Sequence, residues 1–237
     1  MVKQVISSCS ALTKLIFPEN LYSIGREAFD GCESLKYPYI PESVSFIGKQ
    51  AFMGCEKLET VEFASVETVC EMYFAFNPSS YTKRLYIAGK EVSHLVIPPT
   101  VSIINQDAFW NSQSLISVEI PDTVTEIGMR AFFYCVNLKE IRIPDSVKKI
   151  NWGAFFGCES LMRVFLGRGL QEIDREVWVG CRSIGRVECL SCKPLHTDES
   201  IFEREIYETA TLIVPKGSKG SYIRVCPWSL FKRIQEV

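Results

Sequence analysis

A unit of 23 residues recurs along most of the chain, and it constrains the fold more than any other feature of the sequence. Of the eight intervals between the residues that end the apolar pattern of each unit, six are 23 residues, one is 34 and one is 25. These residues are Phe17, Ile40, Phe63, Ile97, Ile120, Ile143, Leu166, Cys189 and Val214. Such a regular repeat is typical of a solenoid, in which each unit contacts only its neighbours and a longer interval forms a loop.

Each unit carries the pattern L-x-x-V-x-I, as in Leu138, Ile141 and Ile143. The alternation at its end has a period of two and predicts one short strand per unit. A single unit cannot bury its own apolar side, whereas units stacked about 4.8 Å apart pair their strands in parallel and place like residues on like. The sequence therefore predicts a β-rich solenoid, a right-handed superhelix with a parallel sheet on one face and short irregular or 3-10 turns on the other.

A turn region follows each strand. Prolines such as Pro144 end the strand, because proline lacks a backbone N–H and fixes φ. A second apolar pair, such as Val147 and Ile150, then indicates a corner, and a glycine commonly follows that we expect to adopt a positive φ. These glycines are Gly25, Gly48 and Gly128. The closing pairs are Ala28-Phe29, Ala51-Phe52, Ala108-Phe109, Ala131-Phe132, Ala154-Phe155 and Val177-Trp178.

Cysteines recur at one position of the unit, four residues after the alanine. They are Cys9, Cys32, Cys55, Cys135, Cys158 and Cys181. Side chains stacked in this way point in one direction, so we interpret them as small buried thiols rather than as disulfides. Cys189 and Cys192 have C-x-x-C spacing, but a zinc ribbon needs a second pair, and Cys189 falls on an inward strand position. We therefore predict no metal ion and no cofactor.

The net charge and hydropathy of the chain argue against a nucleic-acid-binding protein and against a membrane-inserted one. A formal net charge of −2 gives no basic excess for nucleic-acid binding. No run of about 18 uncharged apolar residues is present, so we expect no membrane insertion, and no signal peptide is visible. Residues 1–8 read as the end of a unit, with Val5 and Ile6 in the place of Ala-Phe, so we expect the chain to be cut from a longer precursor.

The repeat resembles the BspA-like class of bacterial leucine-rich repeats, whose consensus runs approximately L-x-x-V-x-I-P-x-x-V-x-x-I-G-x-x-A-F-x-x-C. The resemblance covers nearly the whole chain. Residues Leu85–Pro98 resemble the strand, turn and strand with which this family restarts an array, and Ala88-Gly89-Lys90 is a turn signal. Residues Ala210–Ser218 are similar to the start of the family's closing segment. The resemblance implies a leucine-rich repeat solenoid and a secreted or cell-surface protein that adheres to other proteins or cells.

We expect one leucine-rich repeat domain over residues 1–237. Residues 1–80 would hold the N-terminal repeats, with a degenerate unit at 64–84 that offers Phe74 and Phe76 in place of the Ala-Phe closure. Residues 85–209 would hold the C-terminal repeats, ending in an irregular acidic stretch around Asp198 and Glu199. We expect bends or mobile loops at both irregular stretches.

Residues 210–237 would form a short helical cap. Trp228, Phe231 and Ile234 follow Pro227 at steps of three residues. A helix that begins after this proline would lay all three on the last open repeat.

Outward strand positions vary where the inward ones do not, and repeat arrays typically bind partners through such a face. Tyrosine and arginine are enriched in binding hot spots. The candidate partner-binding residues are Tyr37, Tyr39, His94, Arg142, Arg163, Phe165 and Arg186. Mutual support between exposed side chains on neighbouring strands is the alternative explanation for each of them.

Two classes of function fit these observations. We favour a non-enzymatic protein, secreted or at the cell surface, whose partner is a host, extracellular-matrix or other cell-surface protein, with a glycan as a second kind of ligand. The alternative is a structural spacer or assembly module, stacking end to end through weak self-association or presenting another domain. We expect no enzyme, because His94 and His196 lie in different units without a nucleophile motif.

Overall fold

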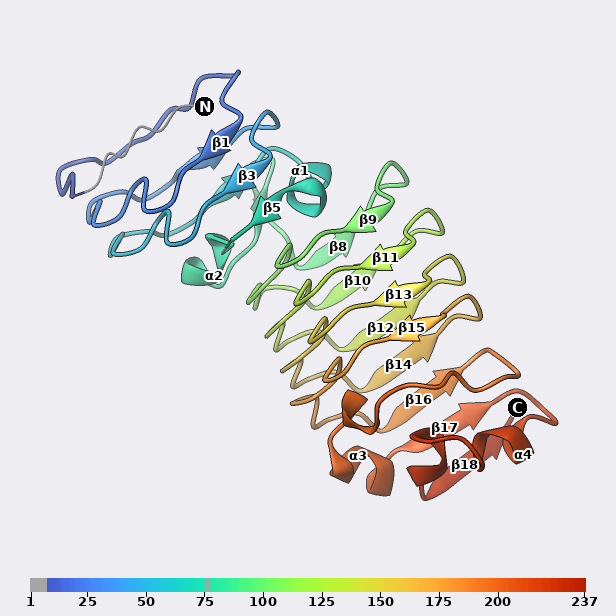
Figure 1. The fold of residues 1–237 in the computed structure, drawn as a ribbon. Coiled ribbons are helices and arrows are strands. Elements are labelled where there is room, and N and C mark those ends of the chain that lie inside the picture. The colour runs from blue at the N-terminus through green and yellow to red at the C-terminus, as the bar shows by residue number, and fades with distance from the viewer. Residues whose placement is uncertain (1–7, 76) are drawn as a thin grey trace.

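The chain winds into a stack of coils that step from the N-terminal to the C-terminal end of the molecule (Figure 1). This computed structural model describes residues 8–75 and 77–237. Val5, Ile6 and Phe76, for which the sequence pattern predicts places in the repeat, lie outside the described residues.

The L-x-x-V-x-I segments form a first series of strands. Its sheets are β2(Tyr39–Ile40)-β4(Glu62–Phe63)-β6(Tyr86–Ile87)-β7(Lys90–Glu91), β8(His94–Val96)-β10(Ser117–Glu119), and β12(Glu140–Ile143)-β14(Arg163–Leu166)-β16(Arg186–Cys189)-β17(Thr211–Val214)-β18(Arg233–Glu236). All pairings are parallel except β6 with β7. That hairpin turns at Ala88 and Gly89, with φ of 48° and 76°, which confirms the predicted turn.

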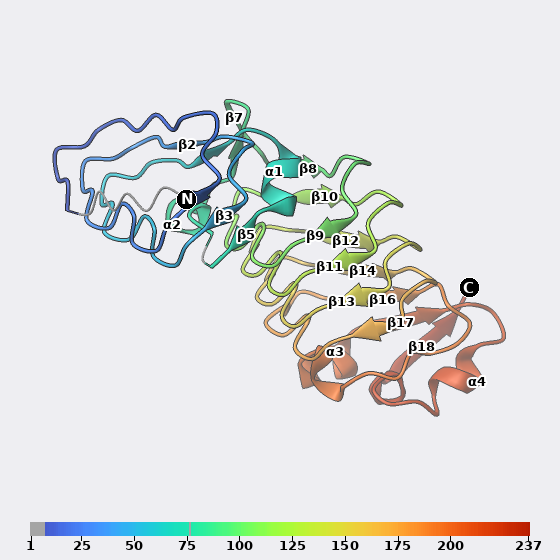
Figure 2. The same ribbon diagram turned by 45° about the horizontal axis from the view of Figure 1, so that its top comes forward.

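The second residue of the second apolar pair, together with the residue before it, forms a second series of strands in most units, where the sequence had indicated only a corner. Its sheets are β1(Ser23–Ile24)-β3(Phe46–Ile47)-β5(Tyr73–Phe74) and β9(Ile103–Ile104)-β11(Glu126–Ile127)-β13(Lys149–Ile150)-β15(Glu172–Ile173). Figure 2 shows the two series running side by side along the stack. These strands form because neighbouring coils place their Val-x-x-Ile segments in register, so the backbone N–H and C=O groups of one coil can pair with those of the next.

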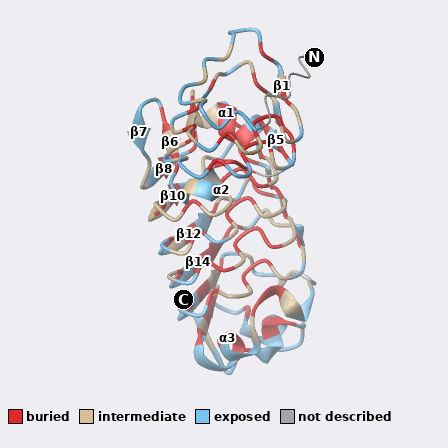
Figure 3. Cartoon of the chain, turned by 90° about the vertical axis from the view of Figure 1, so that its left-hand side faces the viewer, coloured by how far each residue is buried: buried red, intermediate tan, exposed pale blue. Residues whose placement is uncertain are grey.

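Inward residues of both series fill one continuous core (Figure 3). Leu138, Ile141 and Ile143 are at most 1% exposed. The phenylalanines of the Ala-Phe pairs lie ring on ring: those of Phe132 and Phe155 have centroids 5.2 Å apart at an interplanar angle of 2°. Each rung therefore buries the rung before it, which is why the apolar positions repeat so strictly.

Glycine is needed in this fold for a reason other than the expected positive φ. Gly25, Gly48 and Gly128 do not have a positive φ, so that prediction is wrong. A Cβ on Gly48 would lie 2.5 Å from the backbone nitrogen of Arg26, and one on Gly128 would lie 2.6 Å from that of Gln106, whereas one on Gly25 would meet no heavy atom within 4 Å. In these units a positive φ occurs instead just before the Ala-Phe pair, as at Arg130 with φ of 54°. Gly48 and Gly128 thus permit close approach of the preceding coil.

Two short helices, α1(Val66–Glu71) and α2(Ser79–Thr82), occupy the degenerate unit and lie where the first coils meet the longer stack (Figure 1). Ser65 caps α1 by accepting a hydrogen bond from the Thr68 backbone N–H at 3.1 Å. Near these helices the second series is interrupted between β5 and β9, and the first series between the β6–β7 hairpin and β8. Across the junction, the Asn105 backbone N–H and its side-chain amide donate to the carbonyl oxygens of Cys70 and Glu71, at 2.9 and 2.7 Å.

The irregular acidic stretch is partly helical. It contains the 3-10 turn η1(Glu199–Ile201) and α3(Arg204–Thr209). Asp198 caps η1 by accepting a hydrogen bond from the Ser200 backbone N–H at 2.8 Å. Hydrogen bonding from the Ser200 side chain, and then from its backbone N–H, lowers the pKa of the Asp198 carboxyl.

The predicted helical face of the cap is wrong. After α4(Lys219–Tyr222), Trp228 opens the three-residue turn η2(Trp228–Leu230), and Phe231 is already extended. Ile234 lies in β18, opposite Leu212 of β17. Trp228 and Phe231 are buried as expected, but the chain adds one more parallel strand to the sheet in place of a helix.

The stacked cysteines are buried thiols, as predicted, except for exposed Cys9 in the first described coil. The thiols of Cys135 and Cys158 donate to the carbonyl oxygens of Phe109 and Phe132 at 3.2 and 3.3 Å. Burial raises the pKa of Cys135 to about 12. These thiols therefore stay protonated at neutral pH and act as small core residues.

The close approach of coils can be tested with alanine. We expect Gly48→Ala and Gly128→Ala each to lower the free energy of unfolding by about 1–3 kcal/mol, since the added methyl group meets backbone atoms. Gly185→Ala is the matched control; no heavy atom lies within 4 Å of its added Cβ, so the change should stay below about 1 kcal/mol. Urea unfolding measures all three, and equal effects would contradict the explanation.

Thiol accessibility gives a second test. With iodoacetamide at neutral pH, we expect the native protein to be modified at Cys9, Cys192 and Cys226, the three exposed cysteines. The buried thiols should react only after unfolding, because the thiolate is the reactive form and burial disfavours it. Peptide mass spectrometry gives the modified positions; labelling of Cys135 or Cys158 in the native state would show that the core is open.

Candidate binding surface

The outward side chains of the first strand series form a surface that we call the strand face. Arg142 lies on β12, Arg163 and Phe165 lie on β14, and Arg186 lies on β16. Register brings these four together, because Arg142 is opposite Phe165 and Arg163 is opposite Arg186. The candidate residues from the C-terminal repeats thus form one group, apart from His94.

Each exposed arginine of this group already has a partner within the chain. Arg163 forms a salt bridge with Glu140 at 2.5 Å, and Arg186 forms one with Glu188 at 2.6 Å. The side chains of Arg163 and Arg186 remain 55% and 48% exposed. Exposed ion pairs are weak, so an incoming carboxylate can compete for either guanidinium.

Phe165 is not available as an exposed hot spot, contrary to the prediction for this residue. It is only 8% exposed, because the Arg142 guanidinium lies over its ring with the guanidinium carbon 4.0 Å from the ring centroid. This cation–π contact fixes the direction of the Arg142 side chain. The ring therefore serves as a support for an arginine that is itself exposed.

The other candidate residues lie elsewhere. His94 is exposed on β8, where its Nδ1 is 2.7 Å from the Ser117 hydroxyl oxygen. Tyr39 lies on β2 and is 45% exposed, and Tyr37 just before it is 55% exposed. The Tyr37 hydroxyl donates to the Glu59 carboxylate, which also accepts from Lys36; these hydrogen bonds lower the pKa of Glu59 and raise that of Tyr37.

Sequence reasoning missed Arg233 as a member of the strand face. It follows Thr211 in the row that holds Arg163 and Arg186. Its guanidinium donates to the Thr209 carbonyl oxygen at 2.8 Å, and the residue is exposed. Its place could not be seen in the sequence, because the closing segment was read as a helix rather than a strand.

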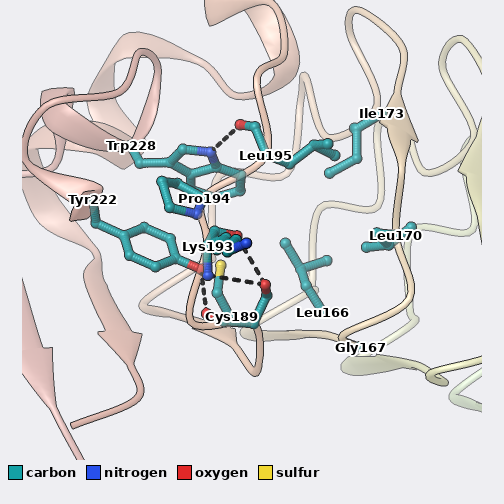
Figure 4. Close-up of a pocket in the computed structure, with 11 residues that line it drawn as sticks. Leu166, Gly167, Leu170, Ile173, Cys189, Lys193, Pro194, Leu195, Tyr222 and Trp228 are labelled. Carbon is teal, nitrogen blue, oxygen red and sulfur yellow. Dashed lines mark hydrogen bonds between the residues drawn. The ribbon is translucent and has the colours of Figure 1, made fainter. Parts of the chain in front are cut away.

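A small cavity of about 210 Å³ lies between the last repeats and the cap (Figure 4). Leu166, Leu170, Cys189, Tyr222 and Trp228 are among its lining residues. The Tyr222 hydroxyl donates to the Ser191 carbonyl oxygen and the Trp228 indole N–H donates to that of Leu195. With these donors engaged, the cavity offers mainly apolar contact.

Within the described ranges, no cluster of three or more histidine, cysteine, aspartate or glutamate side chains could hold a metal ion. Over the same residues, none of the helices has the length and apolar character needed to cross a membrane.

Comparison with known proteins agrees with the observed architecture. The family model for the BspA-type leucine-rich repeat region matches residues 3–91 and 82–206, in six copies. A search of curated proteins found no match.

Several solved structures are similar. A leucine-rich repeat protein of T. pallidum is 23% identical, with 91% of this chain and 79% of that chain covered and a TM-score of 0.39. A leucine-rich cell surface protein of Faecalibacterium prausnitzii is also 23% identical, with 73% and 58% covered and a TM-score of 0.44, so the chain spans little over half of its length. The pneumococcal vaccine antigen PcpA is 14% identical, with 93% and 78% covered and a TM-score of 0.53, a likeness of fold.

The 23-residue coils, their paired strands and their stacked phenylalanines provide a physical basis for the family match. The chain belongs to the BspA-type leucine-rich repeat family.

Proposed function

We propose that this protein is a non-enzymatic binding module, secreted or displayed at a cell surface, that holds a partner protein on its strand face. The family supports protein binding, since its stacked repeats present an extended surface of variable side chains. The proposed partner is a host, extracellular-matrix or cell-surface protein that presents carboxylates to the arginines. A glycan is the second kind of ligand to test.

One observation carries the proposal. Arg163 and Arg186 lie directly opposite each other on neighbouring strands, and Arg233 follows in the same row beyond Thr211. Arg142 lies beside them in the adjacent row, opposite Phe165. Parallel pairing fixes their backbone spacing at about 4.8 Å per strand. Guanidinium groups held at a fixed spacing can bind several carboxylates of one partner at once, which gives specificity as well as affinity.

The core leaves this face free to vary. The outward residues can change without altering a rung, because the inward side chains at Ile141, Val164 and Val187 are completely buried. Substitutions on the face should therefore affect binding and leave the fold intact.

The test measures binding to immobilised extracellular-matrix proteins by biolayer interferometry. We expect wild-type protein to bind at least one of them, and Arg163→Ser with Arg186→Ser to weaken that binding by about tenfold or more. The control pair, Lys148→Ser with Arg175→Ser, removes the same charge from exposed positions outside the strand face and should bind like wild type. Equal loss in both pairs, or unchanged binding by the first, would contradict the strand face as the site.

A specific observation favours self-association as a second function. An apolar cavity of about 220 Å³ lies at the first described coils, and Leu15, Phe17, Ile24 and Phe29 are among its lining residues. Ile16, which also lines it, is 78% exposed.

If the coils stack end to end through this opening, sedimentation velocity should show a mass that rises with concentration. Ile16→Asp should abolish the rise, because a buried unpaired charge at the contact is strongly unfavourable. The arginine pair of the strand face should leave it unchanged. A single monomeric species at all concentrations would remove this function.

A further inference from the structure

The N-terminal part of the second strand series exposes aromatic side chains on three successive coils. Tyr22 is 69% exposed, Phe46 is 41% exposed and Tyr73 is 61% exposed. Phe46 and Tyr73 lie directly opposite each other on β3 and β5, whereas the residue opposite Phe46 on β1 is Ser23 and Tyr22 directly precedes that strand. The Ser45 backbone N–H donates to the carbonyl oxygen of Tyr22 at 2.9 Å, which holds Tyr22 beside the other two coils. We call Tyr22, Phe46 and Tyr73 the aromatic strip.

Three of the four equivalent strand positions are charged in the C-terminal repeats. The outward residue of β9 is Ile103, which is 42% exposed, and those of β11, β13 and β15 are Glu126, Lys149 and Glu172. Lys149 forms a salt bridge with Glu172 at 2.9 Å. The structure therefore tolerates charged residues at these positions, and stacking of the coils does not by itself require the exposed aromatic rings.

A shallow groove of about 480 Å³ adjoins the aromatic strip. Ser45 and Met72, which directly precede Phe46 and Tyr73, line it together with Val44, Ser65 and Thr68. Three carboxylates, those of Glu42, Glu67 and Glu71, also line it. Among the described residues, none of these three forms a salt bridge, although Glu67 accepts a hydrogen bond from the Thr100 hydroxyl at 3.1 Å.

The Glu71 carboxylate has no basic partner within its own helix. Glu71 is the last residue of α1, and no basic residue lies in the last turn of that helix. The terminal carbonyl oxygens of α1, at Cys70 and Glu71, already accept hydrogen bonds from Asn105, so the negative charge offered to a ligand is that of the Glu71 carboxylate itself. Glu42 and Glu71 are both exposed and open to a cation.

We propose that the aromatic strip and this acidic groove bind a basic, apolar-containing peptide segment of a protein partner, at a site separate from the strand face. Apolar side chains of the segment pack on Phe46 and Tyr73, and its arginine or lysine side chains reach the carboxylates of Glu42 and Glu71. Arginine also stacks on exposed tyrosine rings, which joins the two parts of the surface. The chain thus presents two faces of opposite preference: arginines for an acidic partner and carboxylates for a basic one.

The test uses three fluorescein-labelled 12-residue peptides that share the same leucine and phenylalanine positions. Their polar positions are all arginine, all glutamine or all glutamate. By fluorescence anisotropy, we expect the arginine peptide to bind at least about tenfold more tightly than the other two. Its affinity should fall as the salt concentration is raised. Hydrogen exchange should show protection by the arginine peptide at β3, β5 and α1.

Two double variants measure separately what the carboxylates and the aromatic rings contribute to peptide binding. Glu42→Gln with Glu71→Gln should reduce binding of the arginine peptide by about tenfold and leave the glutamine peptide unchanged. Glu67 is left intact because it lies in the first turn of α1 and supports the helix. Phe46→Ser with Tyr73→Ser should weaken binding of both the arginine and the glutamine peptide. Circular dichroism should show that the fold of this variant is unchanged.

The matched control, Glu126→Gln with Glu172→Gln, removes two carboxylates from the C-terminal part of the same strand series and should bind like wild type. The proposal is overturned if the arginine peptide binds wild type and the Glu42/Glu71 variant equally, or if the glutamate peptide binds as tightly. It is also overturned if protection falls on the strand face, or if Phe46→Ser with Tyr73→Ser abolishes a dimer, which would make a second copy the occupant. The Glu42/Glu71 variant should keep its matrix-protein binding, so this test is independent of the proposed strand-face function.

Discussion

Stacking of identical buried side chains on parallel, in-register backbones is the constraint on which the rest of the structure depends. Each coil is too short to enclose a core, so the apolar side of one coil is buried only by the next. Phe109, Phe132 and Phe155 show the result, with successive ring centroids 5.1 and 5.2 Å apart. The thiol hydrogen bonds of the cysteine positions and the close backbone contacts at Gly48 and Gly128 belong to the same repeat geometry.

This constraint explains what sequence reasoning could foresee. Inward positions such as Leu138 and Ile141 are dictated by the repeat, and their burial followed from periodicity alone. The second strand series was missed because two-residue strands carry no alternation of their own and arise from register between coils. Helix α1 could have been predicted from Ser65 as its N-cap and Glu67 in its first turn. Comparison with the repeat consensus showed only that this unit lacks the proline, glycine and Ala-Phe positions.

The candidate sites were harder to foresee, because they depend on contacts between side chains from different coils. The exposed position of Phe165 was inferred from strand alternation, yet Arg142 on the neighbouring strand covers its ring. The alternation itself was correct; the covering residue lies 23 positions earlier in the chain. In the same way, the aromatic strip joins Tyr22, Phe46 and Tyr73 from three coils, a grouping that becomes visible only once the second series of strands is known.

The junction near α1 and α2 is a boundary for cooperative unfolding along the stack. The ladder of the second series stops between β5 and β9, and that of the first series stops between the β6–β7 hairpin and β8. Side-chain amides supply part of the connection: Asn77 donates to the carbonyl oxygens of Asp107 and Ala108, and Gln106 donates to that of Phe74. In a linear array, cooperativity is transmitted only between neighbours, so the weakest coupling sets the boundary of each cooperative block. Because the core itself is continuous across this junction, the side-chain contacts there set how strongly unfolding of the first coils is coupled to unfolding of the C-terminal stack.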